Sequence, residues 1–271
     1  MRHPLPLIFS AAVAGWTLCA PAARAQEGLE AAAILDGWDM GGGVRMAALR
    51  LDLAPGWKTY WRSPGEGGIP PLFDWSASDN LGAVRVHWPL PEVWTTNGLR
   101  AIGYGGTLIL PIEVRAADPG RPVVLAVLAD IGVCADICQP ARVAVGPVSI
   151  GGAPGPEAEA IAAALADRPA EGAAAGVARA TCRTEPMPGG LRLVAELVAP
   201  ALGPEEVAVI EADAPDLWLS EARAHRDGPV LRAEAEVYPT AGGGVLLDRE
   251  RITITVLAAG RGYEWRGCGA G

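Results

Sequence analysis

The stretch "VLAVLADIGVCADICQPARVAV" (residues 124–145) determines how the first half of the chain folds. Two runs rich in Val, Leu, Ile and Ala flank a short segment that holds Cys134 and Cys138. Runs of this kind joined by a three-residue turn predict an antiparallel β-hairpin. Cysteines that flank such a turn can face the same side, close enough to form a disulfide. The spacing alone leaves three roles open for the pair: a structural disulfide, a redox couple or two ligands of a metal ion.

Segments on both sides of this hairpin have a similar β pattern. Turns rich in Gly and Pro separate them, and the chain has 35 Gly and 24 Pro. Strands at this spacing predict an all-β chain made of two immunoglobulin-like β-sandwich domains. The clearest strand segments are residues 44–54, 83–88, 107–116 and 122–133 in the first half, and 191–199, 206–212, 217–225, 229–239 and 251–260 in the second half.

The composition changes at Gly151, where Gly, Pro and Ala begin to dominate without any alternating pattern. Within this stretch "PEAEAIAAALADR" (residues 156–168) predicts a short helix, because Ala and Leu favour helices and Pro156 suits a first turn. We therefore place the first domain at residues 27–150, a linker with a short helix at 151–176 and the second domain at 177–271.

The N-terminus has the pattern of a secretory signal peptide. Arg2 precedes an apolar run from Leu5 to about Ala20, and Ala23 and Ala25 have the spacing of a cleavage site. We expect residues 1–25 to be removed on export. The mature chain is then a soluble, periplasmic or secreted protein that does not span a membrane.

The charge balance excludes one class of partner. The full chain has 22 basic and 31 acidic residues, and removal of Arg2 and Arg24 with the signal peptide leaves 20 basic residues and a net charge of −11. An acidic exported protein is a poor candidate for binding nucleic acid or anionic lipid. We expect no nucleic-acid partner.

Four cysteines remain after export, and an even number in an oxidising compartment predicts two disulfides with three possible pairings. Two separate domains favour the local pairing, Cys134 with Cys138 and Cys182 with Cys268. The second bond would join the beginning and the end of domain two across 86 residues. The chain-entropy model gives such a loop roughly 4–5 kcal/mol. We interpret Cys182–Cys268 as a structural disulfide.

The surroundings of the first pair favour neither a metal site nor a strongly reactive thiol. His87 and His225 lie in different domains, and neither a C-x-x-C nor an H-x-x-x-H motif is present as a partner, so no metal site is predicted. Asp130 and Asp136 flank Cys134, and carboxylates disfavour a thiolate. Arg142 is the nearest base in the sequence. This setting suits a disulfide that is attacked by a partner's thiolate, or a thiol whose reactivity depends on docking.

Three segments together resemble the N-terminal periplasmic domain family of the thiol:disulfide interchange protein DsbD, in its suppressor-of-copper-sensitivity-like branch. They are "GWKTYWRSPGEGGIPPLFDWSAS" (56–78), "IGYGGTLILPIEV" (102–114) and "IGVCADICQPARV" (131–143), in this order. The resemblance covers most of domain one, and the two-domain layout is similar to that branch. It implies an immunoglobulin-like sandwich with a redox-active cysteine pair on a hairpin. Such a domain receives electrons from a membrane-embedded domain and passes them to periplasmic disulfide proteins.

Carried over by motif, the resemblance makes Cys134 and Cys138 the catalytic pair. Cys138 would form the mixed disulfide with a partner, and Cys134 would resolve it. Tyr104 and Gly105 match a cap loop that shields the disulfide until a partner docks. No cofactor is implied. The expected partners are periplasmic thioredoxin-like or disulfide isomerase proteins, with a separate membrane electron transporter as the source of electrons, so any protein-disulfide reductase-like activity would depend on a partner.

The chain departs from the family pattern at three points. Three residues separate its cysteines, whereas the best-known type has five. Gly103 stands where the cap loop of that type has a phenylalanine, so the shielding aromatic is either absent or supplied from elsewhere. The sequence ends at Gly271 without the membrane and thioredoxin-like domains of full-length members, and we therefore expect a stand-alone domain whose reductant is another protein.

Two other functions stay open at this point. With purely structural disulfides, the Trp-rich first domain would be a non-enzymatic periplasmic binding module for a peptide or a glycan. A copper-handling protein is the second alternative, because two thiolates suit Cu(I). Tyr104 could also be an ordinary aromatic residue at a strand edge. Four aromatic residues of the first family segment are interpreted as packing residues: Trp57, Tyr60, Trp61 and Trp75.

Overall fold

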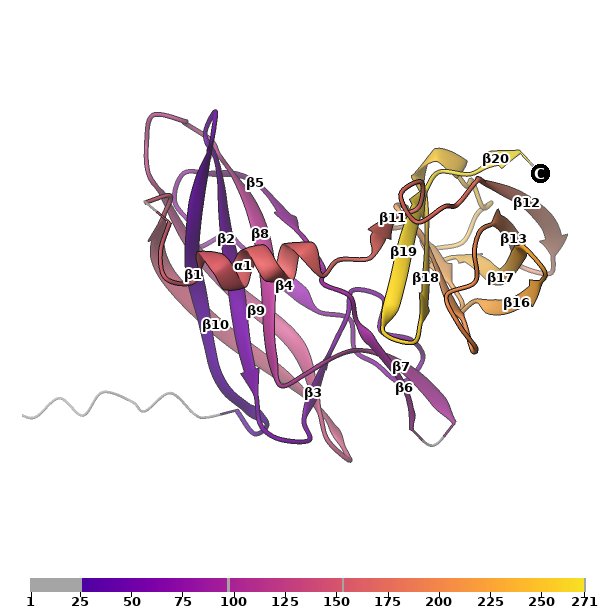
Figure 1. Cartoon of the computed structure of the whole chain (residues 1–271), viewed down its shortest axis with the longest axis horizontal. Coiled ribbons are helices and arrows are strands. Elements are labelled where there is room, and N and C mark those ends of the chain that lie inside the picture. Colours follow the sequence, from indigo (N-terminus) through magenta and orange to yellow (C-terminus); the bar gives the residue numbers. More distant parts are fainter. Residues whose placement is uncertain (1–25, 97, 153, 271) are drawn as a thin grey trace, which may run out of the picture.

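The computed structural model describes residues 26–96, 98–152 and 154–270, and the predicted signal peptide lies outside them. The prediction of an all-β, immunoglobulin-like fold is confirmed: two β-sandwiches follow one another along the chain, with one short α-helix between them (Figure 1). None of the helices in the described part is long and apolar enough to cross a membrane.

Domain one is a sandwich of two sheets. The first has the strand order β1-β2-β8-β5, and the second has the order β10-β9-β3-β7-β6 with β4 paired to β9. The strands are β1 (Leu29–Gly41), β2 (Val44–Leu53), β3 (Lys58–Tyr60), β4 (Leu72–Asp74), β5 (Leu81–Val86), β6 (Glu92–Thr96), β7 (Leu99–Gly105), β8 (Thr107–Ala116), β9 (Val123–Cys134) and β10 (Cys138–Ile150).

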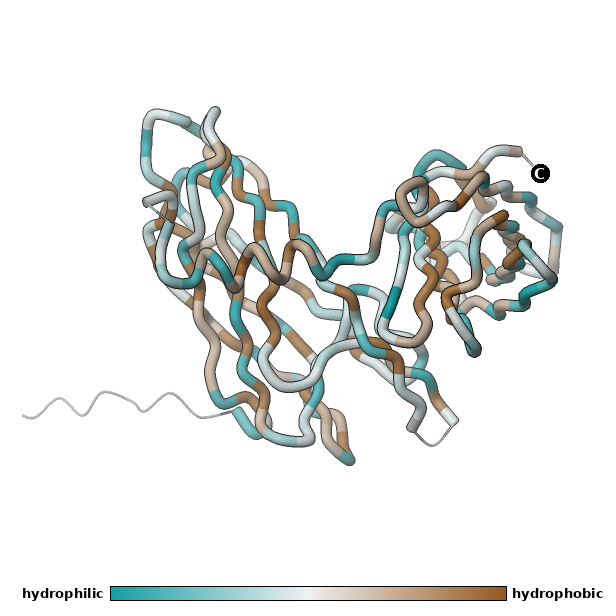
Figure 2. The backbone as a smooth tube through the Cα atoms, viewed as in Figure 1, coloured by the Kyte–Doolittle hydropathy of each residue, from teal (hydrophilic) through white to brown (hydrophobic). Residues whose placement is uncertain are grey.

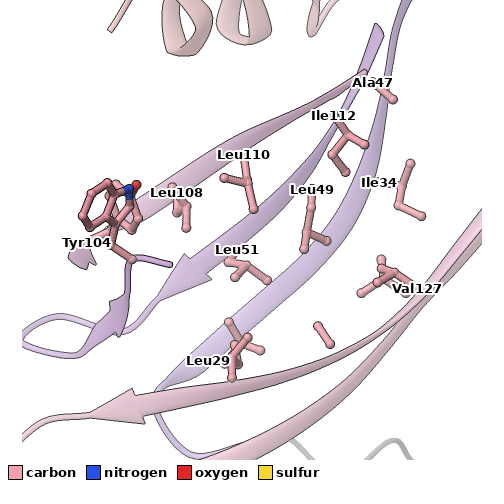
Figure 3. Packing of buried hydrophobic residues seen from close by; sticks show 14 of the residues in the cluster. Leu29, Ile34, Ala47, Leu49, Leu51, Tyr104, Leu108, Leu110, Ile112 and Val127 are labelled. Carbon is pink, nitrogen blue, oxygen red and sulfur yellow. The ribbon is translucent and has the colours of Figure 1, made fainter. Parts of the chain in front are cut away.

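Side-chain alternation along the strands builds the core of domain one. Leu49 and Leu51 on β2, with Leu110 and Ile112 on β8, point between the sheets toward Val127 of β9 (Figure 3). Hydrophobic and hydrophilic residues alternate along the strands of both domains (Figure 2). Because successive side chains of a strand point to opposite faces, this pattern places one face of each sheet in the core.

The helix covers the outer face of the first sheet. Helix α1 (Ala158–Ala166) lies across β1, β2 and β8 (Figure 1), and its Ile161 is fully buried against Leu35, Met46 and Ala48. This second contact explains why β2 is buried on both faces at its centre. The short strand β11 (Ala170–Glu171) then pairs with β19 (Arg261–Arg266) of domain two. The segment predicted as a linker therefore packs against both sandwiches.

Domain two is also a sandwich, with the strand orders β11-β19-β18-β14 and β15-β17-β13-β12-β20, and with β16 paired to β17. Its remaining elements are β12 (Arg179–Met187), β13 (Gly190–Val198), β14 (Val207–Ala212), β15 (Leu217–Leu219), β16 (Arg223–Asp227), β17 (Val230–Pro239), the 3-10 turn η1 (Arg249–Arg251), β18 (Ile252–Ala258), β19 (Arg261–Arg266) and β20 (Gly269–Ala270).

The predicted strand 217–225 is two strands, β15 and β16, that both pair with β17. Ser220 lies at the break and takes over part of the pairing. Its amide donates to the carbonyl oxygen of Glu236, and its hydroxyl accepts from the Glu236 amide at 2.9 Å. A side chain that replaces a ladder partner interrupts a strand without leaving the backbone unpaired.

The two domains share part of one hydrophobic core. Val207, Val209 and Leu257 of domain two belong to the buried cluster of domain one, and Leu90 of domain one contacts Gly262 of β19. A second cross-domain contact is the ion pair between Arg100 and Glu221, at 2.9 Å. The domains therefore meet through apolar packing as well as through charged side chains.

Candidate functional site

The hairpin of β9 and β10 positions the first cysteine pair. The antiparallel register aligns Val133 with Gln139 and then Cys134 with Cys138, directly across the ladder. The two Cα atoms are 4.1 Å apart, and a disulfide joins the side chains. Residues directly opposite each other in a hairpin point to the same face. A three-residue turn at the end of these two strands is therefore sufficient to form the bond.

The two cysteines differ in their exposure to solvent. Cys134 is 5% exposed, whereas Cys138 is exposed. Ile137, in the turn between them, is 73% exposed. A molecule that approaches the hairpin tip meets Cys138 before Cys134. The disulfide therefore has an accessible sulfur and a protected one.

The hydroxyl of Tyr60 lies against both sulfur atoms. Its Oη is 2.9 Å from Sγ of Cys134 and 3.0 Å from Sγ of Cys138. The same oxygen lies 3.1 Å from the carbonyl oxygen of Gly67. A phenol has one proton to donate, so this hydroxyl can donate to either sulfur or to the carbonyl. Among the described residues, Tyr60 is the one whose side chain lies within hydrogen-bond distance of the disulfide sulfur atoms.

Close packing fixes the ring of Tyr60. A Cβ atom on Gly132 would lie 2.9 Å from the ring, and one on Gly68 would lie 2.8 Å from it. Trp94 of β6 stacks on the same ring, with ring centroids 6.2 Å apart. Tyr60, Cys134 and Ala101 form a small buried cluster that Ile69 and Trp94 cover. Only glycine lets the tyrosine ring approach the hairpin this closely at position 132.

The basic residue that is nearest to the cysteine pair in the sequence is not the one aligned with Cys134 in the sheet. Arg142, the nearest base in the sequence, forms a two-fold hydrogen-bonded pair with Asp130, at 2.7 and 2.8 Å. These hydrogen bonds hold the pKa of Asp130 below its usual value. The base directly opposite Cys134 is Lys58 of β3, whose Nζ lies 4.2 Å above the ring of Trp94. Lys58 is thus the basic residue aligned with Cys134 in the sheet.

Tyr104 and Gly105, predicted as the cap loop, lie on β7, and strand β3 separates β7 from the hairpin that carries the cysteines. Tyr104 belongs to the core between the two sheets, near Leu108 (Figure 3), and its hydroxyl donates to the carbonyl oxygen of Pro89 at 2.8 Å. Gly105 is aligned with Lys58, which separates it from Cys134. The structure thus does not bring Tyr104 to the disulfide, and a cap role for this pair stays a prediction.

The second cysteine pair is joined inside domain two. Cys182 on β12 is 2% exposed, and a disulfide with Cα atoms 5.5 Å apart links it to Cys268, next to β20. Strand β20 pairs in parallel with β12 at this point. Across the described residues, no three His, Cys, Asp or Glu side chains are grouped so that they could hold a metal ion.

Residues 33–148 match the family model described as "Thiol:disulfide interchange protein DsbD, N-terminal". Domain one is a DsbD N-terminal-like domain. The chain is also similar to a solved structure, the N-terminal periplasmic domain of ScsB from Proteus mirabilis, with a TM-score of 0.60 and 21% identity over 89% of this chain and 92% of that one. At this identity the second likeness shows the fold. No curated protein matches the chain.

The contact of Tyr60 with the disulfide of the DsbD N-terminal-like domain was not predicted from the sequence. The sequence predicts Tyr60 as a packing residue, like Trp57, Trp61 and Trp75, and its ring does pack. The alternation within "KTYW" (residues 58–61) held a usable signal: Lys58 and Tyr60 share one face, and Thr59 and Trp61 share the other. Only the pairing of β3 with β9 shows that the first face is the one with the cysteines.

Proposed function

We propose that the DsbD N-terminal-like domain exchanges thiols and disulfides with partner proteins through Cys134 and Cys138. The observation that carries this proposal is the arrangement of the bond. An exposed Cys138 is joined to a buried Cys134, and a tyrosine hydroxyl lies within hydrogen-bond distance of both sulfur atoms. A bond with only a structural role needs neither an accessible sulfur nor a proton donor.

The exchange has two steps, and the electrons balance. A partner thiolate attacks Sγ of Cys138, the Cys134–Cys138 bond breaks, and Cys134 leaves as a thiolate. The second thiol of the partner, as its thiolate, then attacks the partner sulfur of this mixed disulfide, so that Cys138 leaves. Two electrons have passed from the partner, which is now a disulfide, to the cysteine pair, which takes up two protons as it becomes a dithiol. The reverse sequence reduces an oxidised partner.

Tyr60 supports the departure of the Cys134 thiolate. Burial raises the pKa of Tyr60, so the phenol keeps its proton in neutral solution. Its hydroxyl, 2.9 Å from Sγ of Cys134, is placed to donate to the sulfur that becomes negative. Hydrogen bonds to charged groups are stronger than those between neutral groups. The phenol therefore stabilises the leaving group more than it stabilises the intact disulfide.

The size of the closed loop favours the same interpretation. In the chain-entropy model a loop as short as the one closed by Cys134 and Cys138 contributes roughly 2 kcal/mol, about half of the value for the loop closed by Cys182 and Cys268. Reduction of the first bond therefore leaves most of the stability of the domain in place. A bond that opens and closes repeatedly must satisfy this condition.

The partners follow from the family and from the chemistry. The family model bears the name of a thiol:disulfide interchange protein, and the ScsB domain is a periplasmic one. We propose a periplasmic location for this chain as well. Its partners would be thioredoxin-like or disulfide isomerase proteins on one side and a membrane electron transporter on the other. The exposed Ile137 offers an apolar contact beside Cys138 for such a partner.

The direct test is equilibration of the folded protein in graded glutathione buffers, followed by alkylation of free thiols. We expect Cys134 and Cys138 to become alkylated together over a narrow range of glutathione ratio, while Cys182 and Cys268 stay bonded. Tryptophan fluorescence monitors folding in the same samples. If the first pair stays oxidised until the fluorescence reports unfolding, the exchange function is wrong.

We expect Tyr60→Phe to slow reduction of the disulfide by dithiothreitol about tenfold at neutral pH. The substitution keeps the ring and removes the hydrogen bond to the leaving thiolate, and a hydrogen bond to a charged group is worth about 1.5–3 kcal/mol. The measurement is the rate of reduction, with Tyr104→Phe as the matched control, because that hydroxyl contacts Pro89 instead. Equal rates in wild type and Tyr60→Phe would show that the hydroxyl does not assist.

A further inference from the structure

Arg62 connects the strand that carries Tyr60 to domain two. It lies two residues after Tyr60, and its guanidinium donates to both carboxylate oxygens of Glu211 on β14, at distances from 2.8 to 3.1 Å. It also donates to Glu264 on β19, at 2.6 Å, and lies 4.2 Å above the ring of Trp61. A planar guanidinium held by two carboxylates is fixed in orientation as well as in position.

The three charged side chains are largely shielded from water, with 24% of Arg62, 25% of Glu211 and 17% of Glu264 exposed. Burial opposes the charge of Arg62, but the two carboxylates outweigh it and raise the pKa of the guanidinium. Burial also opposes the charge of Glu264, yet Arg62 and hydrogen bonds from Arg266 keep its pKa below the usual value. Removal of Arg62 would leave the shielded carboxylate of Glu211 without this partner.

The chain between Arg62 and Tyr60 has little freedom. Trp61 is fully buried, and its amide donates to the carbonyl oxygen of Ile102 at 3.0 Å. Beyond Arg62, six residues of the segment 63–70 line a cleft of about 480 Å³ between the domains, and Val209 and Trp218 of domain two line it as well. This segment includes the Gly67 carbonyl next to the Tyr60 hydroxyl. Arg62 thus ties the chain between Tyr60 and this segment to domain two.

We propose that domain two completes the redox site by fixing Arg62, which acts as a positioning residue and holds the Tyr60 hydroxyl at the two sulfur atoms. The inference rests on the proposed exchange function and gives the second domain a part in it. A purely electrostatic effect of the same cluster on the stability of the cysteine thiolate would have the opposite sign. Removal of two negative charges would favour a thiolate, whereas a displaced Tyr60 withdraws a hydrogen bond from it.

The test is the double variant Glu211→Gln/Glu264→Gln, which breaks the contact from the side of domain two and leaves Arg62 in place. We expect dithiothreitol to reduce its Cys134–Cys138 disulfide about fivefold more slowly than in wild type, within the range of measured couplings between contacting residues. In the reduced protein, the pH profile of alkylation of Cys134 is expected to move to higher pH. On a Tyr60→Phe background the same two substitutions should change the rate by less than about twofold.

The matched control is Glu221→Gln, which removes a carboxylate from the other cross-domain ion pair, with Arg100, and should leave the rate within about twofold of wild type. If the double variant does not fold cooperatively, Arg62→Lys keeps the charge but loses the two-fold contact, and a two- to threefold slower reduction is expected. An unchanged or faster rate in the folded variants, or additivity with Tyr60→Phe, overturns the inference. These outcomes differ from failure of the exchange function, in which wild type itself resists reduction while folded.

Discussion

Replacement of Cys138 by serine is expected to abolish disulfide exchange with partner proteins, with a loss of at least about a thousandfold, as is usual when a nucleophile is removed. Cys138 is the exposed member of the pair, so a partner thiolate meets it before the buried Cys134. The measurement is the rate at which the reduced variant opens the disulfide of an oxidised thioredoxin-like protein.

Cys134→Ala is the informative companion, because it retains the attacking thiol and lacks the resolving one. We expect it to react once and to accumulate a mixed disulfide through Cys138, visible as a species of the combined mass under non-reducing conditions. If Cys138→Ser accumulates the mixed disulfide and Cys134→Ala does not, the two roles are reversed. The buried position of Cys134, 5% exposed, argues against that reversal.

Removal of the second disulfide is expected to have the largest effect on stability. The double variant Cys182→Ala/Cys268→Ala should lower the free energy of unfolding by about 4–5 kcal/mol, because the bond closes a long loop and joins β12 to the end of the chain. Typical domains are stable by about 5–15 kcal/mol, so this loss is a large fraction of the total. Urea unfolding followed by tryptophan fluorescence measures the change.

The matched control is Cys134→Ala/Cys138→Ala, which removes a bond with a much shorter loop. We expect that variant to lose about 2 kcal/mol or less. The assignment of one bond to structure and the other to exchange predicts this order. A larger loss for the Cys134/Cys138 variant would contradict it, because the domain would then depend on the bond that is proposed to open.

Much of the fold could be predicted from the sequence because the alternation of apolar residues, the turns and the helix-forming residues agreed with one another. The alternating residues 107–116 form β8, and the hairpin around Cys134 has the predicted turn. The predicted helix at residues 156–168 contains α1. Its packing on β1 and β2 was not predicted, since a short Ala-rich helix carries a weak amphipathic pattern and Ile161 alone marks the buried side.

Less of the site could be predicted from the sequence, because its key contacts join residues that are distant in the chain. Cys134 and Cys138 could be found from spacing and resemblance, but Tyr60 lies 74 residues before Cys134. The glycine at position 103 left open whether an aromatic residue from elsewhere covers the disulfide. Tyr60 from β3 is the aromatic residue whose hydroxyl contacts both sulfur atoms, and the pairing of β3 with β9 brings it there. Arg62 gave no signal at all, because its partners lie in the other domain.

The central claim is that the folded DsbD N-terminal-like domain opens its Cys134–Cys138 bond by attack at Cys138. The most direct measurement is brief exposure of the folded wild-type protein to glutathione, rapid acid quenching and mass spectrometry of the peptides. We predict that glutathione is found on Cys138, with Cys134 free and Cys182–Cys268 intact. Glutathione on Cys134, or no adduct at either cysteine in protein that remains folded, would contradict the account.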